Sequence, residues 1–294
     1  MTDRVFIVGC GDIGERTARL WQQKGCEVSG LARSQESVER LEGIGVDPVR
    51  GDLDRPATLD GLSVAGTLVY YFAPPPAEGG SDSRMEAFLA GIAEGDEPEK
   101  IVYISTSGVY GDQGGALVDE TVTPAPRTER SQRRFAAEKT LRDWERERGV
   151  PVVILRVPGI YGPGRLPLDR LRGGMAVVRE EEAPPTNRIH ADDLARICFL
   201  AGERGGRGDT FNVGDGCEGT MSEYFLRVAE LWGLPRPESI SMQEAHGRLS
   251  PAMLSYLQES RRLDTTRLRE KLGFEPLYPD LKAGLQAIRA EEEQ

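Results

Sequence analysis

The stretch that decides the fold is RVFIVGCGDIG, residues 4–14. A short apolar strand, Arg4–Val8, leads into three glycines spaced Gly-x-Gly-x-x-Gly, and an amphipathic helix is expected over Ile13–Lys24. In this pattern the first glycine allows a tight turn, the second lets a ligand approach the backbone, and the third lets helix and strand pack closely. The N–H groups that open such a helix attract phosphate. The stretch therefore predicts a dinucleotide site contacted by Gly9, Gly11, Asp12, Ile13 and Gly14.

The same alternation of strand and helix continues through the first two-thirds of the chain. Strands are expected over Arg4–Val8, Glu27–Ala32, Pro48–Gly51, Thr67–Phe72, Ile101–Ser105, Val152–Val157 and Thr210–Val213. Helices are expected over Ile13–Lys24, Ser37–Ile44, Ser83–Ala93, Arg130–Arg148 and Asp192–Ala201. This order predicts an α/β fold, a doubly wound parallel Rossmann sheet with a smaller C-terminal lobe. We expect residues 1–162, with sheet elements from 186–215, to form the dinucleotide-binding domain, and 163–185 and 216–294 to form the lobe.

Composition narrows the choice of partners. The 294 residues carry a net charge of −11, which argues against nucleic acid or an anionic membrane as partner. The sequence has no apolar run long enough to predict a membrane span. Because a strand is expected at Arg4–Val8, we expect no signal peptide before it. The four cysteines are scattered without a Cys-x-x-Cys pair, so we expect reduced thiols, a cytoplasmic protein and no metal site.

The end of the second expected strand indicates which dinucleotide is bound. Sites that prefer NAD usually place an acidic residue there, to hold the ribose hydroxyls. Here the strand ends Gly30-Leu31-Ala32 and continues with Arg33 and Ser34, without a carboxylate. Arg33 can pair with a 2′-phosphate and Ser34 can donate a supporting hydrogen bond. The sequence therefore favours NADP(H) over NAD(H); the alternative is that Arg33 is an ordinary exposed arginine.

Later motifs occur in a recognisable order. They are Gly51-Asp52-Leu53, Tyr71–Pro75, Ile104–Gly111, Leu155–Gly164, Arg188–Asp193 and Phe211–Gly214. Together with the first turn, they resemble the extended and atypical short-chain dehydrogenase/reductases, the NAD(P)-dependent epimerase/dehydratase family. The resemblance implies a substrate-binding C-terminal lobe and a homodimer formed through the helices at 83–93 and 130–148. It also implies further cofactor contacts, namely Asp52 and Leu53 at the adenine, Ala73 and Pro74 along the cofactor, and Pro158 and Ile160 beside the nicotinamide.

The resemblance places catalytic groups on the fifth strand and the following helix. Thr106 takes the position of the family's catalytic Ser or Thr, where its hydroxyl would bond the substrate oxygen. The family's Tyr-x-x-x-Lys pair is missing from the helix, which reads ERSQRRFAAEK over 129–139. One register puts Arg130 and Arg134 at the pair, and the other puts Phe135 and Lys139 there. Spacing from Thr106 favours the first register.

The arginines of that helix cannot replace the missing acid, because arginine does not release its proton near neutral pH. Arg134 would instead hold the ribose or orient an anionic substrate, while a solvated helix face is the alternative for these arginines. Tyr110 and Tyr161 are candidates for the missing proton donor, although a structural role is the usual one at both positions. His190 is expected to anchor a turn.

Two functions remain open on the sequence. The leading hypothesis is an NADP(H)-binding oxidoreductase or epimerase/dehydratase-like enzyme that acts on a small or nucleotide-linked carbonyl or alcohol. The alternative is a catalytically weak or inactive NADP(H)-binding sensor or scaffold protein, which the missing tyrosine favours. The C-terminal lobe does not identify the substrate, since fold and family alone do not.

Overall fold

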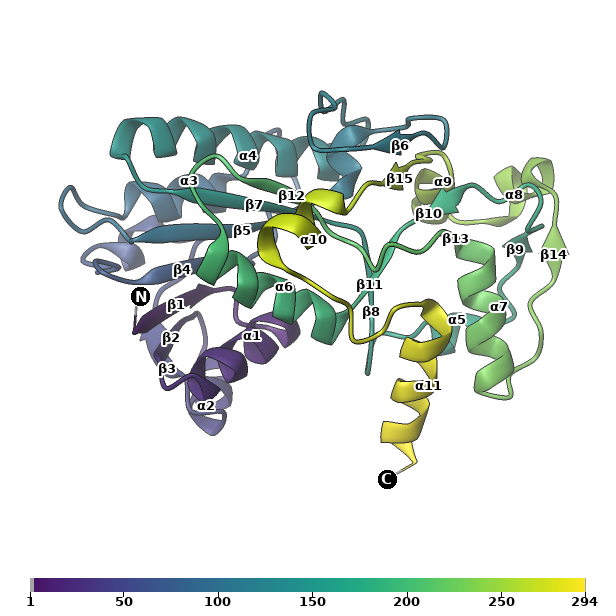
Figure 1. The fold of residues 1–294 in the computed structure, drawn as a ribbon, viewed down its shortest axis with the longest axis horizontal. Coiled ribbons are helices and arrows are strands. Elements are labelled where there is room, and N and C mark those ends of the chain that lie inside the picture. The colour runs from purple at the N-terminus through teal and green to yellow at the C-terminus, as the bar shows by residue number, and fades with distance from the viewer. Residues whose placement is uncertain (1–2, 294) are drawn as a thin grey trace.

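The computed structural model describes residues 3–293 and has a seven-stranded parallel sheet at its centre (Figure 1). The strands lie in the order β12 (Thr210–Asn212), β7 (Val152–Val157), β5 (Lys100–Thr106), β4 (Leu68–Tyr71), β1 (Arg4–Val8), β2 (Glu27–Ala32) and β3 (Asp47–Arg50). In β1, Val5 pairs with Val28 of β2 and Leu68 of β4. Every residue of β4 and β7 is buried, because helices cover both faces of the sheet.

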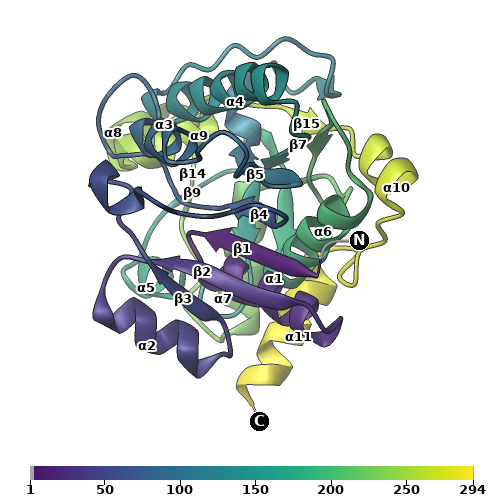
Figure 2. The same cartoon turned by 90° about the vertical axis from the view of Figure 1, so that its left-hand side faces the viewer.

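One face is covered by α1 (Asp12–Gln23), α2 (Gln35–Gly43) and α6 (Ala191–Arg204), and the other by α3 (Ser83–Ala90) and α4 (Glu129–Arg148) (Figure 2). A buried hydrogen-bond chain ties α1 to α6 across β4. Trp21 Nε1 donates to Tyr70 Oη at 2.9 Å, and Tyr70 Oη donates to the Cys198 carbonyl at 3.0 Å. The sheet and its two helical layers confirm the doubly wound fold.

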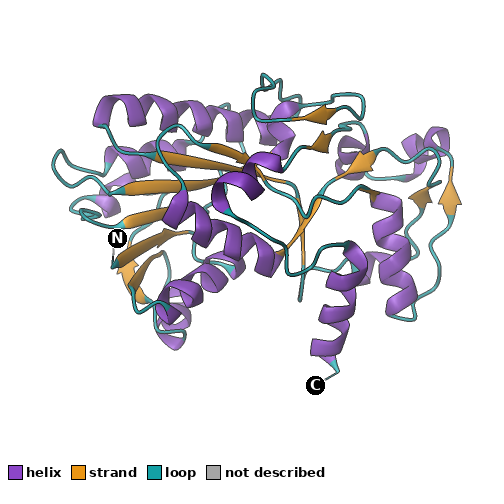
Figure 3. Cartoon of the chain, in the orientation of Figure 1, coloured by secondary structure: helices purple, strands orange, loops and turns teal. Residues whose placement is uncertain are grey.

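The smaller lobe packs around a core of its own, and helices predominate in it (Figure 3). Its helices are α5 (Leu168–Arg172), α7 (Met221–Leu231), α8 (Met242–Arg248), α9 (Pro251–Leu257) and α11 (Leu281–Glu292). Phe225 and Val228 of α7 meet Leu285 and Ile288 of α11 in the centre of this core. Strand pairs of two or three residues complete it, namely β8 (Gly159–Tyr161) with β11 (Arg188–His190), β9 (Val177–Val178) with β14 (Ser239–Ile240), and β10 (Pro185–Thr186) with β13 (Gly219–Thr220).

The last third of the chain does not stay in the lobe. After α9 it returns to the sheet, where β15 (Arg262–Leu263) pairs with β6 (Leu117–Val118) and α10 (Thr266–Leu272) packs on α6. Leu268 and Leu272 of α10, with Phe274, belong to the hydrophobic core on the α1–α6 face. The expectation that 216–294 lies wholly in the lobe is therefore corrected for this segment. The remaining short helices are η1 (Pro56–Leu59) and η2 (Ser107–Tyr110).

The expected helices and strands agree with the structure to within a few residues. The largest differences at the ends of helices are three residues: α3 ends at Ala90, before the expected Ala93, and α6 ends at Arg204, after the expected Ala201. Within residues 3–293, no helix is both long and apolar enough to cross a membrane.

Candidate active site

The turn between β1 and α1 has the geometry that a pyrophosphate requires. Gly9 has φ +86°, and a side chain there would bring its Cβ within 2.5 Å of the Ala73 nitrogen. A Cβ on Gly14 would lie 3.3 Å from both the Gly9 oxygen and Ile7 Cγ2, so helix and strand are in close contact. Gly11 is the N-cap of α1, has no side-chain cap, and would direct a Cβ into open space. The turn therefore leaves free room for a ligand at the positive end of α1, and its residues fit the pyrophosphate of a dinucleotide.

A cavity of about 490 Å³ extends from this turn along the ends of β1 to β4. Most of the residues expected to contact the cofactor on this side line the cavity. They are Gly9, Gly11, Arg33, Ser34, Asp52, Leu53, Ala73 and Pro74. Asp12 and Ile13 do not line it. Ile13 is buried in the core, and Asp12 accepts hydrogen bonds from Arg16 Nε at 2.7 Å and Arg165 Nε at 2.6 Å. Burial raises the pKa of Asp12, but the two arginines outweigh this and hold it below its usual value.

The region around the expected 2′-phosphate is positively charged. Arg33 is 68% exposed, and its Nη1 lies 3.9 Å from the Asp54 carboxylate, which is too long for a strong ion pair. That carboxylate is already held by two hydrogen bonds of 2.7 Å from Arg84. Ser34 caps α2, where its Oγ accepts from the Ser37 nitrogen. Arg40, in the last turn of α2, lines the same cavity and forms an ion pair with Glu15.

A second cleft of about 550 Å³ lies between the ends of β5 and β7 and the smaller lobe. Three residues that the sequence placed near the nicotinamide line it: Thr106, Pro158 and Ile160. Thr106 is the last residue of β5, and its Oγ1 accepts a hydrogen bond from the Gly108 nitrogen at 3.1 Å. The hydroxyl hydrogen of Thr106 remains available to a ligand.

One face of α4 points toward the cleft. Arg134 lines it and donates to the Ile104 carbonyl at 2.8 Å, while Arg130 lines it one turn earlier. One turn later, Glu138 lies buried beneath the strand ends and accepts from Ser105 Oγ at 2.5 Å and from Arg156 Nη2 at 2.8 Å. Phe135 instead packs in a separate hydrophobic cluster with Val109 and Tyr110, and Lys139 lies over its ring. The helix face that lines the cleft therefore carries Arg130 and Arg134, the pair that the first register aligns with the family's tyrosine and lysine. Phe135 and Lys139, the pair of the other register, lie on a different face.

The two loop tyrosines and the histidine lie in the interior. Tyr110 is fully buried and donates to Asn212 Oδ1 at 2.7 Å, and burial raises its pKa. Burial also raises the pKa of Tyr161, whose enclosed hydroxyl has no hydrogen-bond partner among residues 3–293. His190 caps α6 by accepting from the Asp192 nitrogen, which agrees with its expected anchoring role. Since Tyr110 points into the core, its placement argues against the proton-transfer role that the sequence suggested.

The cleft is rich in arginine although the chain as a whole is acidic. The guanidinium groups that line it are those of Arg130, Arg134, Arg165, Arg170, Arg188 and Arg261. Arg188 donates to the Thr220 carbonyl at 2.6 Å and lies 4.7 Å from the Tyr224 ring centroid, but makes no ion pair within the described part of the chain. Burial lowers its pKa. The charges of Asp215 and Glu223 act in the opposite direction, but neither forms an ion pair with Arg188 among the described residues. A buried guanidinium group without an ion pair favours an anionic ligand.

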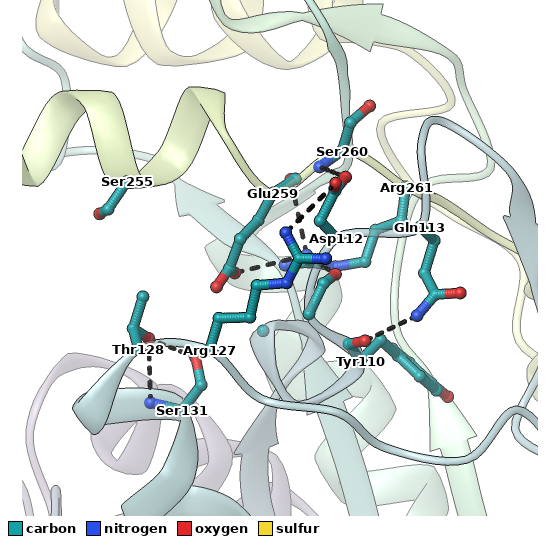
Figure 4. Close-up of polar contacts among 12 residues, drawn as sticks. Tyr110, Asp112, Gln113, Arg127, Thr128, Ser131, Ser255, Glu259, Ser260 and Arg261 are labelled. Carbon is teal, nitrogen blue, oxygen red and sulfur yellow. Dashed lines mark hydrogen bonds and ion pairs between the residues drawn. The ribbon is translucent and has the colours of Figure 1, made fainter.

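Arg261 lies at the edge of this cleft, where the loop after η2 meets the segment that follows α9 (Figure 4). It donates to the Gly111 carbonyl at 2.8 Å and lies 3.5 Å from Glu259 Oε2. The other oxygen of Glu259 is buried without a partner among the described residues. Glu259 is the one acidic residue in the described lining, and Arg165 pairs with Asp12 outside it. Among the described residues, the other four arginines make no ion pair: Arg130, Arg134, Arg170 and Arg188. Sequence reasoning placed Thr106, Pro158 and Ile160 beside this cleft. It missed Arg170 and Arg261, which also line the cleft but belong to no motif.

Comparisons with known proteins agree with this geometry. The model of the NAD dependent epimerase/dehydratase family matches residues 5–214. Protein YeeZ of Escherichia coli K12 is 27% identical over 286 residues, covering 94% of this chain and 97% of that protein. A functionally unknown conserved protein from Silicibacter pomeroyi has a similar structure, with TM-score 0.83, 28% identity and 98% of each chain covered. The UDP-glucose 4-epimerase of Thermotoga maritima, solved with UDP-glucose, has TM-score 0.78 and 21% identity, with 99% of this chain and 98% of that one covered. At that identity the likeness shows a shared fold.

Proposed function

Because this chain belongs to the NAD dependent epimerase/dehydratase family, we propose that it is an NADP(H)-dependent oxidoreductase or epimerase-like enzyme. Its substrate is an anionic small or nucleotide-linked molecule that carries a carbonyl or alcohol group. The observation that carries this proposal is the arginine-lined cleft at the end of β5, next to the open phosphate turn. Ligands of doubly wound folds bind at the carboxyl ends of the strands, where both features lie.

When bound, the nicotinamide cofactor supplies the acceptor or donor of hydride. Gly9 and Gly11 would hold its pyrophosphate at the start of α1. Arg33 and Arg40 would hold the 2′-phosphate, which distinguishes NADP(H) from NAD(H). Arg134 would bind the ribose or an anionic substrate. The end of β2 is followed by Arg33 and not by an acidic residue, which supports the preference for NADP(H).

The substrate side follows from charge and position. Guanidinium groups bind phosphate through paired hydrogen bonds, so an arginine-rich cleft suits a phosphate-bearing substrate. Thr106 has a free hydroxyl hydrogen that would bond to the reacting oxygen of the substrate. A sugar nucleotide of the kind seen with the Thermotoga maritima epimerase has both a phosphate and such an oxygen, which places this class first in a screen.

Cofactor preference is tested by measuring the Kd of NADPH and of NADH through fluorescence, for the wild type and for Arg33→Asp. A charge-assisted contact is worth about 2 kcal/mol, so the variant should lose roughly 30-fold in NADPH affinity and much less in NADH affinity. Equal losses for the two cofactors would contradict the role of Arg33.

Activity is tested by NADPH and NADP⁺ turnover over a panel of sugar nucleotides and small carbonyls. Turnover that Thr106→Val abolishes supports an enzyme with Thr106 at the reacting oxygen. Tight NADPH binding without turnover anywhere in the panel would instead favour the NADP(H)-binding sensor or scaffold.

The homodimer remains a proposal drawn from the family. The exposed positions of α4 carry polar side chains, among them Gln132, Lys139 and Asp143. An interface through α3 and α4 would therefore rely on hydrogen bonds and ion pairs more than on apolar burial. Light scattering after gel filtration measures the mass, and a monomer at micromolar concentration would contradict this assembly.

A further inference from the structure

A tyrosine from the smaller lobe lies against the residue that stands where the family has its tyrosine. Arg130, in the first turn of α4, donates a hydrogen bond from Nη1 to the hydroxyl oxygen of Tyr256. The same guanidinium group lies 4.7 Å from the centroid of the Tyr256 ring. Tyr256 belongs to α9, 126 residues away along the chain. Figure 4 shows α9, marked by Ser255, next to the start of α4, marked by Thr128 and Ser131.

The hydroxyl of Tyr256 is available for proton transfer. The side chain is 44% exposed and lines the cleft that also holds Thr106. An arginine can only donate, so Tyr256 Oη accepts in this contact and keeps its own hydrogen. Within residues 3–293, Arg130 is its one hydrogen-bond partner. The phenol hydrogen can therefore point to a substrate oxygen.

The other tyrosines of the cleft are less suited to this task. Tyr161 is buried, and its hydroxyl lies so close to Gly284 that a Cβ there would be 2.2 Å from it. Tyr224 is covered by Arg188, and burial raises its pKa to about 12. Tyr256 alone among the three combines exposure to the cleft with a cation on its oxygen.

We propose that Tyr256 is the acid and base of this cleft and replaces the tyrosine missing from α4, with Arg130 as its positioning residue. This rests on the proposed function. In the reducing direction the O–H bond of Tyr256 breaks and its proton joins the carbonyl oxygen of the substrate. A bound reduced nicotinamide cofactor would supply the hydride that converts the carbonyl carbon to the alcohol carbon. The phenolate left behind is stabilised by the Arg130 cation until water returns a proton. Oxidation reverses each transfer.

The first test is kinetic, on the substrate found in the panel. Tyr256→Phe should lower kcat by about 100-fold or more, because general acid–base catalysis contributes about 10²–10⁴-fold. KM and the Kd of NADPH should stay within about threefold, because the ring remains in place. Ser255→Ala is the matched control, since this hydroxyl on the same helix donates to the Ala252 carbonyl outside the cleft. A Tyr256→Phe variant with kcat within about threefold of wild type overturns the proposal.

The second test needs neither substrate nor cofactor. Tetranitromethane nitrates the phenolate form of tyrosine, and peptide mass spectrometry reports the rate at Tyr256. Arg130→Met removes the neighbouring cation, so nitration at pH 8 should slow about fivefold or more, although the side chain becomes more exposed. Arg127→Met is the matched control, because Arg127 is exposed in the loop just before α4 and pairs with Asp112. An unchanged or faster rate in Arg130→Met overturns the pairing.

The two tests separate failure of this inference from failure of the proposed function. A wild type that turns over nothing in the panel refutes the proposed function, and the nitration rates still decide whether Arg130 activates Tyr256. A wild type that is active while Tyr256→Phe remains active refutes the role of Tyr256 alone.

Discussion

Replacing Asp215 by asparagine should stabilise this protein, and by an amount that grows with pH. Asp215 lies in the loop after β12, is 5% exposed, and accepts a hydrogen bond from the Cys217 nitrogen at 2.8 Å. Burial raises its pKa from an ordinary 3.8 to about 6, although that hydrogen bond and the charge of Arg188 act in the opposite direction. Asparagine keeps the acceptor oxygen and cannot ionise.

Proton binding decides whether the wild type gains or loses stability as the pH rises. Between pH 3.8 and 6 the folded chain holds this proton more tightly than the unfolded chain does, so the wild type loses stability as pH rises through that window. The two values differ by 2.2 pH units, which at about 1.36 kcal/mol per unit makes a full cost of about 3 kcal/mol. At pH 5 only about half of that cost has developed.

The assay is urea unfolding followed by tryptophan fluorescence at pH 5 and pH 8. The unfolding free energy of Asp215→Asn should exceed that of the wild type by about 1.5 kcal/mol at pH 5 and about 3 kcal/mol at pH 8. Asp169→Asn is the control, because its side chain is 98% exposed, and it should change stability by less than about 0.5 kcal/mol. The reasoning is refuted by a difference that does not change with pH, or by a variant less stable than the wild type at pH 8.

Three further predictions concern buried bonds and the phosphate turn. Glu138→Gln should cost about 3–5 kcal/mol in urea unfolding at pH 7, because it leaves the buried Arg156 unpaired; a cost below about 1 kcal/mol would show that the pair contributes little. Gly11→Ala should fold with stability within about 1 kcal/mol of the wild type, since φ is −92° and its Cβ meets nothing. The same variant should bind NADPH about tenfold or more weakly by fluorescence titration, and unchanged binding would place the pyrophosphate elsewhere. Tyr70→Phe should cost about 1–3 kcal/mol by the same unfolding assay, because Trp21 Nε1 loses its acceptor; no cost would show that water replaces the hydroxyl.

Local patterns along the chain are sufficient to predict the sheet. Strands such as Arg4–Val8 and Val152–Val157 lie where the runs of apolar residues place them, since strands covered on both faces have nearly continuous apolar sequences. Gly9, Gly11 and Gly14 likewise occupy the turn that their spacing predicts. The turn can be predicted because its geometry depends only on the six residues that form it.

The side of the cleft that the smaller lobe contributes could not be predicted in this way. Arg130 meets Tyr256 only because α9 folds back over α4, and no spacing in the sequence encodes a contact across 126 residues. Tyr110 follows a motif beside the site, yet its side chain points into the core, where Asn212 accepts its hydrogen bond. Sequence position predicted which loop approaches the site, and packing decided which way the side chain points.

Both edges of the central sheet are poor templates for a strand from another molecule. At one edge β3 has only four residues, with Pro48 in the strand and the charged Asp47 and Arg50 at its ends. At the other edge β12 has three residues and is packed by α10, whose Arg267 lies over Phe211. Short, charged or proline-bearing edges resist the strand-to-strand addition that begins aggregation. Copies of this protein should therefore associate through their helices and not by extending the sheet, even at the high concentrations used for crystallisation.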